Sequence, residues 1–442
     1  MKKNLFFWIL ALMICANVGC ADNANLELEN AQIEKREQLR ENLSHEVTQA
    51  MARENLEKIL PDLKLPSTRG GDSKLPPITS VYTRGKAAIE TRAGEEIEPY
   101  FHIFNFGDNE GFAIMSGDDR VEPLLALTFE GELTPETEID NPGFEIAYSR
   151  MEDYYVQQVS SRAIEIPGTD IPPKDSIPET IIIDSTYYYT MPLGYCPVRW
   201  GQGFPYNMYC ELDDTLVPTG CVTTAVAQLM SIYKYPDHYS DAHGAACDFN
   251  WNEMNQYTHH NTSLVENPHD KYEQIAELMK QLGKSINLSV IYGKESSHAF
   301  AENIPRTLRN FRYTYGGDLI SYETDTVVRE LANGFPVLIG GEREGENGQR
   351  KGHRWLGHGL MKLISTYKIY RFPQGWITLD PPFETYYILC NWGWDGNANG
   401  YYLSNVFNVT NGAVYPDPIY PNDKKINYNY KYNINVVMNI RK

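Results

Sequence analysis

The chain has 442 residues, a formal net charge of −19 and a hydrophobic content of 42%. Its length predicts two or three domains with room for a sizeable core. The acidic balance argues against nucleic acid as a partner, because the average surface cannot neutralise phosphate groups.

The first twenty residues are typical of an export signal. Lys2 and Lys3 precede an apolar run from Leu5 to Val18, which is too short to span a bilayer. Gly19 and Cys20 close the run and resemble a bacterial lipobox, in which Cys20 would become lipidated. We therefore expect an exported protein, lipid-anchored at the bacterial membrane or cell surface until processing releases it. The alternative is ordinary signal cleavage with an incidental Cys20.

The N-terminal half divides into three segments. Residues 21–75 are charged and contain one helical pattern, Ser44 to Leu63. Residues 76–162 predict a small α+β domain, with extended runs at Tyr100–Phe106, Phe112–Met115 and Val121–Phe129 and a helix over Asn141–Gln158. Residues 163–185 begin with a proline-rich stretch, so we expect an exposed linker that is open to proteolytic activation.

Residues 186–410 predict the main domain. Helical patterns occupy Val222–Tyr235 and Lys271–Leu282, and extended patterns occupy Val337–Gly340, Trp355–Leu363, Tyr386–Asn391 and Gly400–Leu403. Because the helices come early and the strands late, the order predicts an α+β fold with an antiparallel sheet. We assign residues 411–442, rich in Asn, Tyr and Pro, to a C-terminal extension whose structure the pattern does not define.

A candidate nucleophile stands at the start of the first of these helices. Cys221 follows Pro218-Thr219-Gly220 and precedes a run of small residues. Backbone N–H groups at a helix N-terminus favour negative charge, so a thiol there ionises more readily. Taken alone, a buried and inert cysteine is the better interpretation of such a residue.

The residues further along the chain favour a catalytic interpretation. His353 opens a predicted strand, and an imidazole can pair with a thiolate and later protonate a leaving amine. Asn391 ends a later strand and offers an amide that would orient the imidazole, while Trp392 and Trp394 offer rings that would shield that bond from water. Gln202 lies upstream, with an amide that could donate to an oxyanion; alone it would be taken for a surface residue.

These motifs together resemble the C10, or streptopain, family of cysteine peptidases, in a form typical of Bacteroides-like bacteria. The resemblance spans about residues 190–405 and rests on three motifs: Trp200-Gly201-Gln202, Gly220-Cys221-Val222, and Gly352-His353-Arg354-Trp355 with Asn391-Trp392-Gly393-Trp394. The third resembles the family's Gly-His-Ala-Trp. The resemblance implies a papain-like catalytic domain, no cofactor or metal, and protein or peptide substrates.

The N-terminal half resembles the propeptide of the same family. The recognisable stretch runs from Phe104-Asn105-Phe106 to Ser116-Gly117-Asp118-Asp119-Arg120. The resemblance implies a zymogen in which the propeptide inhibits the peptidase until the linker is cut.

One departure concerns the base. The family continues the histidine strand with Asp-Gly, whereas this chain has His358-Gly359, so His358 competes with His353. Residues five apart on a strand face opposite sides, so only one of the two can face Cys221. The Gly-His-x-Trp context favours His353.

Several alternatives stay open. A Cys-His-Asn site also fits a transglutaminase-like acyl transferase, and the aromatic content fits a catalytically silent lipoprotein that binds host protein or glycan. Metal binding by His353 and His358 is poorly supported, because a strand points the two apart. Cys196 and Cys210 flank Gln202 and are either bridged or buried as free thiols.

Overall fold

The structure is a computed structural model, and it describes residues 46–60, 77–85, 99–164, 181–190, 196–257, 267–344, 350–371, 375–378, 383–408 and 434–442. The leader with Cys20 and the charged loop around residues 345–349 lie outside the described residues.

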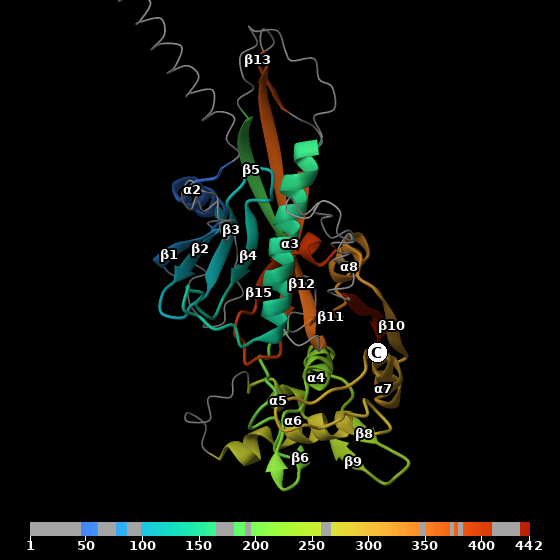
Figure 1. The fold of residues 1–442 in the computed structure, drawn as a ribbon. Helices are drawn as coiled ribbons and strands as arrows, with labels where there is room; N and C mark the ends of the chain where they lie inside the picture. Colours follow the sequence, from blue (N-terminus) through green and yellow to red (C-terminus); the bar gives the residue numbers. More distant parts are fainter. Residues whose placement is uncertain are drawn as a thin grey trace, which may run out of the picture.

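A twelve-stranded antiparallel sheet runs through both halves of the chain (Figure 1). From one edge to the other its strands are β1 (Ile78–Gly85), β2 (Pro99–Phe106), β3 (Phe112–Ser116), β4 (Leu124–Thr128), β15 (Gly400–Leu403), β14 (Phe383–Asn391), β12 (Arg350–Arg371), β11 (Val337–Glu344), β16 (Asn435–Arg441) and β10 (Tyr315–Ser321). Two further strands, β5 (Ile181–Thr190) and β13 (Gly375–Thr378), pair with the long strand β12.

The helices lie in two groups. In the N-terminal half, α2 (Gln49–Ile59) packs on β3 and the long α3 (Pro142–Ile164) crosses the sheet. In the C-terminal half the helices are α4 (Cys221–Tyr233), α5 (Trp251–Met254), α6 (Pro268–Gly283), α7 (Ile304–Asn310) and α8 (Thr324–Ala332). Figure 1 shows α4, α5 and α6 together at one end of the molecule, with the hairpins β6–β7 (Glu211–Leu212, Thr215–Leu216) and β8–β9 (His238–Ser240, Ala246–Asp248).

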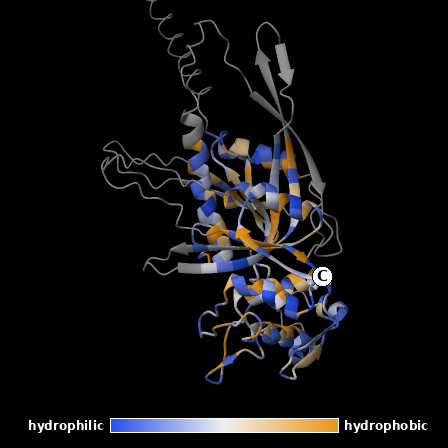
Figure 2. Ribbon diagram, turned by 90° about the vertical axis from the view of Figure 1, so that its right-hand side faces the viewer, coloured by the Kyte–Doolittle hydropathy of each residue, from blue (hydrophilic) through white to orange (hydrophobic). Residues whose placement is uncertain are grey.

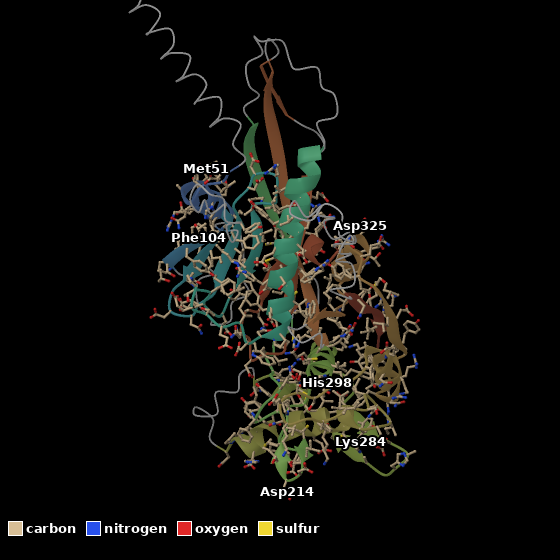
Figure 3. The ribbon with its side chains drawn as sticks, viewed as in Figure 1. Met51, Phe104, Asp214, Lys284, His298 and Asp325 are labelled. Carbon is tan, nitrogen blue, oxygen red and sulfur yellow. The ribbon has the colours of Figure 1, made fainter. Side chains whose placement is uncertain are left out.

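The sheet separates two hydrophobic cores. Along β12, Trp355 belongs to the core shared with α3, and the next residue, Leu356, belongs to the core around α4 and α6. This alternation follows from the two-residue period of a strand. Figure 2 shows hydrophobic residues along the facing sides of strands and helices. Of two residues labelled in Figure 3, Phe104 is fully buried, whereas Met51 on α2 is exposed.

The two halves join through main-chain pairing between β4 and β15. Ala126, Leu127 and Thr128 lie opposite residues 400–402 in antiparallel register. A Cβ at Gly400 would approach the carbonyl oxygen of Leu127 to 2.2 Å, so this position requires glycine. The N-terminal domain therefore completes the sheet of the C-terminal domain.

The predicted α+β architecture, with Cys221 on a helix and His353 on an antiparallel sheet, is confirmed. Three boundaries need correction. The segment 21–75 contains α2, whose Ala52, Leu56 and Ile59 are buried in the N-terminal core. Residues 181–185 of the expected linker 163–185 belong to β5, which pairs with β12. The extension 411–442 contains β16, which pairs with β10 and β11.

Candidate active site

Cys221 is the first residue of α4, and its side chain is half-buried. The preceding Gly220 has φ of 89°, and a Cβ there would lie 3.0 Å from the carbonyl oxygen of Ser297. Glycine meets both the dihedral and the spacing without strain. Since Cys221 opens the helix, its thiol lies near backbone N–H groups that have no partner within the helix.

Two hydrogen bonds attach the Gln202 loop to the start of α4. The backbone N–H of Thr219 donates to the carbonyl of Gln202 over 3.0 Å. The hydroxyl of Thr224 donates to the carbonyl of Gly201 over 3.3 Å. The main chain of Gln202 is therefore held beside the residues that lead into Cys221.

His353 reaches the site from β12 and is 5% exposed. Its Nε2 lies 2.7 Å from the backbone carbonyl oxygen of Trp392. Because a carbonyl oxygen only accepts, Nε2 carries the proton and Nδ1 is left as the basic nitrogen. The imidazole stacks on Trp355 at a centroid distance of 6.4 Å and meets the Trp394 ring edge to face at 6.2 Å.

The surroundings of Cys221 favour its thiolate form. Burial by itself would raise the pKa of the thiol. A hydrogen bond and Coulombic attraction from His353, followed by the backbone N–H and the charge of Arg354, outweigh burial, so the pKa of Cys221 is lowered. His353 is therefore the group that does most to lower the pKa of Cys221.

Asn391 does not occupy the expected place beside the imidazole. Its Oδ1 accepts from Gln228 Nε2 at 3.0 Å and from the backbone N–H of Gly393 at 3.2 Å. Its Nδ2 donates to the carbonyl of Val198 at 2.8 Å. The expectation that the Asn391 amide contacts His353 is therefore wrong. The amide instead fixes the turn whose Trp392 carbonyl makes that contact.

The two tryptophans play different parts in this geometry. Trp392 is fully buried, and its Nε1 donates to the carbonyl of Ala398 at 2.8 Å. Its main chain, and not its ring, approaches His353 through a hydrogen bond. Trp394 is half-buried and lies edge to face with the imidazole, where a ring can exclude water.

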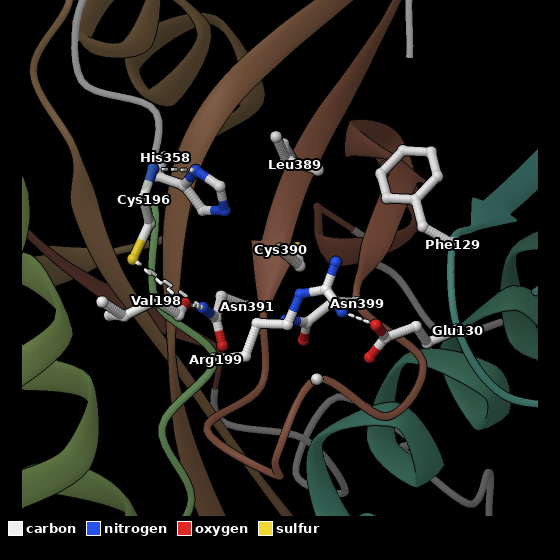
Figure 4. A pocket seen from close by; sticks show the side chains of 11 residues that line it. Phe129, Glu130, Cys196, Val198, Arg199, His358, Leu389, Cys390, Asn391 and Asn399 are labelled. Carbon is white, nitrogen blue, oxygen red and sulfur yellow. Dashed lines mark hydrogen bonds and ion pairs between the residues drawn. The ribbon is translucent and has the colours of Figure 1, made fainter. Parts of the chain in front are cut away.

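His358 lies elsewhere on β12, against Cys196. Its Nδ1 accepts from the backbone N–H of Cys196 at 3.1 Å, as Figure 4 shows. Burial lowers the pKa of His358 to about 3, so the ring is neutral at ordinary pH. His358 lies between Gly357 and Gly359, where a β-bulge shifts the register of β12 against β14.

The cysteines resolve the open question of a bridge. Cys196, Cys210, Cys221, Cys247 and Cys390 are all free thiols. Cys196 Sγ contacts the carbonyl of Val198 at 3.5 Å, whereas Cys210 Sγ contacts the hydroxyl of Tyr292 at 3.8 Å. In this structure Cys196 and Cys210 are therefore not linked to each other.

Two features of the site were not predicted from the sequence. The Trp392 carbonyl is a backbone atom, which no residue pattern identifies. The second is Gly143, the second residue of α3: a Cβ there would lie 2.6 Å from Cδ2 of His353 and 2.5 Å from the Trp392 ring. The N-terminal domain thus lies directly against the imidazole.

Two protein families match separate parts of the chain. Residues 200–402 match the Peptidase C10 family, and residues 41–155 match the Spi protease inhibitor family. The match to the inhibitor family includes α2, which lies outside the domain predicted at residues 76–162.

Relatives extend across both regions. The chain is 26% identical over 345 residues to the thiol protease/hemagglutinin PrtT of Porphyromonas gingivalis, covering 72% of this chain and 35% of that protein. It is 23% identical over 363 residues to streptopain of Streptococcus pyogenes serotype M1, covering 71% of this chain and 76% of that protein. A fragment of Prevotella intermedia prointerpain A, of known structure, aligns at a TM-score of 0.47 and 21% identity, covering 80% of this chain and 98% of that fragment.

Proposed function

Because this chain is a C10-family cysteine peptidase with a Spi inhibitor domain, we propose that Cys221 is its nucleophile and His353 its general base in the hydrolysis of peptide bonds within proteins. The observation that supports these roles is the placement of His353. Its Nε2 is occupied by the Trp392 carbonyl, and the imidazole hydrogen-bonds the thiol of Cys221.

The chemistry follows from this arrangement. The thiolate of Cys221 attacks the scissile carbonyl carbon, and the displaced electron pair moves onto the carbonyl oxygen. His353 Nδ1, which took the proton of the Cys221 thiol when the thiolate formed, then gives that proton to the leaving amine as the C–N bond breaks and a thioester forms. A water molecule, deprotonated by the same Nδ1, hydrolyses the thioester and returns the free enzyme.

Three further residues support the reaction. The Gln202 amide and the backbone N–H of Cys221 donate to the oxyanion of each tetrahedral intermediate. Trp394 excludes water from the imidazole. Asn391 acts through the Trp392–Gly393 turn and not by direct contact with His353.

The inhibitor domain keeps the enzyme latent through the start of α3. Gly143 packs on His353 and Trp392, and Asn141 Nδ2 donates to the carbonyl of Asn397 at 3.0 Å. An ion pair between Glu130 and Arg199 adds a second link (Figure 4). With α3 against the imidazole, that side of the site is closed to substrate.

Activation then requires cleavage between the two domains. We place the cleavage within residues 165–180, because α3 ends at Ile164 and β5 begins at Ile181, and backbone that is paired in a helix or strand resists proteolysis. Residues 76–162, extended to include α2, form the propeptide, and the peptidase domain of 186–410 gains β5 and β16.

Export and anchoring rest on the leader. A basic start, a short apolar run and Gly19-Cys20 favour cleavage before Cys20 and its lipidation. Among the described residues, no helix is both long and apolar enough to cross a bilayer. Replacing Cys20 by serine should abolish incorporation of radiolabelled palmitate in a bacterial host; unchanged labelling would exclude this anchor.

The decisive experiment follows self-cleavage of the chain produced without residues 1–20. The wild type should cleave itself within 165–180, and Cys221→Ala should remain intact under the same conditions. Cys196→Ala is the matched control, since it removes a thiol that lies beside the other histidine. Persistent cleavage in Cys221→Ala would overturn the nucleophile assignment.

The same preparations separate the alternatives. A transglutaminase-like acyl transferase would incorporate a labelled primary amine into protein, and a silent binding protein would cleave nothing. We expect hydrolysis that a thiol alkylator blocks and a metal chelator does not.

A further inference from the structure

Arg354, the residue after His353, is a buried cation with no role in the reaction described above. It is 6% exposed. On β12 it faces the same side as Leu356, which belongs to the core around α4. Its side chain is therefore on the face of the sheet that α4 covers, and Cys221 begins that helix.

The guanidinium is held in one place by two neighbouring strands of the sheet, β11 and β16. Nη1 donates to the carbonyl of Leu338 on β11 at 3.0 Å, and Nη2 donates to Oδ1 of Asn435 on β16 at 2.5 Å. A Cβ at Gly340 would lie 2.4 Å from Cζ of Arg354, so the guanidinium lies flat on that glycine. Arg354 is therefore a buried and hydrogen-bonded side chain, not a solvated surface arginine.

The charged groups that act on this cation include two carboxylates, those of Glu302 and Glu342. Both hydrogen-bond acceptors are neutral, so they orient the guanidinium without cancelling its charge. Burial lowers the pKa of Arg354 to about 10, and the charges that oppose this are those of Cys221, Glu302 and Glu342. The backbone N–H of Arg354 also hydrogen-bonds the sulfur of Cys221. Both the backbone N–H and the charge of Arg354 therefore favour the thiolate form of Cys221.

We propose that Arg354 is a positioning residue for the nucleophile: its buried guanidinium, fixed by Leu338 and Asn435 over Gly340, stabilises the thiolate of Cys221 in addition to His353. The family motif has alanine at this position, so this chain adds a cation beside a site that otherwise relies on its histidine. The inference rests on the proposed function in taking Cys221 as the nucleophile.

The test measures the alkylation rate of Cys221 by iodoacetamide across pH, in the full chain without the leader, with the modified peptide quantified by mass spectrometry. Arg354→Met removes the charge and keeps the length of the side chain. We expect alkylation at acidic pH to fall about three- to tenfold, because losing an adjacent cation raises the pKa of a thiol. Arg354→Lys should recover part of the rate.

Two variants change the guanidinium without removing it. Asn435→Asp should lower the acidic alkylation rate in the same direction, because a carboxylate would neutralise the cation. Gly340→Ala should do so by displacing it. Arg441→Met, on the same sheet but paired with Glu330, is the control and should leave the profile unchanged.

The outcomes are distinguishable from failure of the proposed function. If Cys221 were not the nucleophile, the wild type itself would alkylate like an ordinary thiol. If the wild type reacts at acidic pH and a folded Arg354→Met matches it, the electrostatic role of Arg354 is overturned. A change of peptide preference with an unchanged alkylation profile would also overturn it, in favour of a substrate contact.

Discussion

Two cysteine–histidine neighbourhoods lie along β12, and they differ in chemistry. In one, Cys221 is half-buried at the start of a helix and hydrogen-bonds the imidazole of His353. In the other, Cys196 is 4% exposed, and His358 accepts a hydrogen bond from its backbone N–H, not from its thiol. The residue types are the same in both places.

Both thiols are desolvated, so the difference comes from the contact that each one makes with its histidine. Burial raises the pKa of Cys196 to about 11 and lowers the pKa of His358 to about 3, so both groups stay neutral. At Cys221 the hydrogen bond and charge of His353 outweigh burial and lower the pKa of the thiol. A thiol near a histidine becomes a nucleophile only where the ionic pair is stabilised more than burial penalises it.

Replacing each histidine in turn gives the largest expected difference in activity between the two neighbourhoods. His353→Gln should lower kcat/KM for a peptide substrate by about 10²–10⁴-fold, because the general acid and base is lost. His358→Gln should change it less than about tenfold, since that ring contacts Cys196, which is outside the proposed catalytic pair. Both variants are assayed after the propeptide is removed with an added protease. Equal losses would mean that the two neighbourhoods are not functionally distinct.

Gln202 sharpens the comparison within one segment of the chain, because it follows Cys196 and Val198 yet is proposed to act with Cys221. Gln202→Ala should lower kcat by about 10²–10³-fold with little change in KM, since an oxyanion donor acts mainly in the transition state. Gln274→Ala is the control: its Oε1 accepts from the backbone N–H of Asn250, far along the chain from the site. A rise in KM with unchanged kcat would contradict the oxyanion role.

The sequence could predict the elements that have a local pattern, but not the contacts that depend on residues far apart in the chain. The helix predicted at 222–235 and the strand predicted at 386–391 have periodic patterns and agree closely with Cys221–Tyr233 and Phe383–Asn391. The strand predicted at 355–363 is only the middle of β12, which runs from Arg350 to Arg371. Chain order with the family motifs favoured His353 over His358. The strand at 435–441 was not predicted, because its partners lie about a hundred residues upstream in β10 and β11. The orienting contact on His353 was also missed, because Trp392 supplies it from its main chain.

Asn391 connects the two neighbourhoods, so it tests whether they are independent. Its Nδ2 donates to Val198 beside Cys196, and its Oδ1 accepts from Gly393 beside the Trp392 carbonyl. Asn391→Ala should lower kcat/KM by roughly tenfold to a hundredfold, comparable with the loss of an orienting partner one step from the reacting groups. It should also lower the free energy of unfolding by about 1–3 kcal/mol, because buried partners lose their hydrogen bonds.

The pH dependence of activity separates these two effects of Asn391. If the amide acts only through the turn, the variant should keep the wild-type pH profile with a lower maximum. A profile displaced along the pH axis would instead show that Asn391 influences the ionisation of His353 or Cys221 directly.

The smallest effect concerns the stability of the neutral neighbourhood in acid. His358 has an ordinary pKa of 6.5 when unfolded and about 3 when folded. The unfolded chain therefore binds a proton first as pH falls, so the folded state is most favoured above 6.5 and loses stability between 6.5 and 3. At pH 5.5 the loss from this one ring should be roughly 1.4 kcal/mol relative to neutral pH.

Replacing His358 by leucine isolates that contribution, because leucine fills the buried site without titrating. Urea unfolding at pH 7.5 and pH 5.5, in a Cys221→Ala background that prevents self-cleavage, gives the change in the free energy of unfolding for each chain. His358→Leu is expected to be less stable at both pH values, since the backbone N–H of Cys196 loses its acceptor, but to lose roughly 1.4 kcal/mol less on acidification. If both chains lose the same amount, His358 titrates normally in the folded state, and burial does not keep its ring neutral.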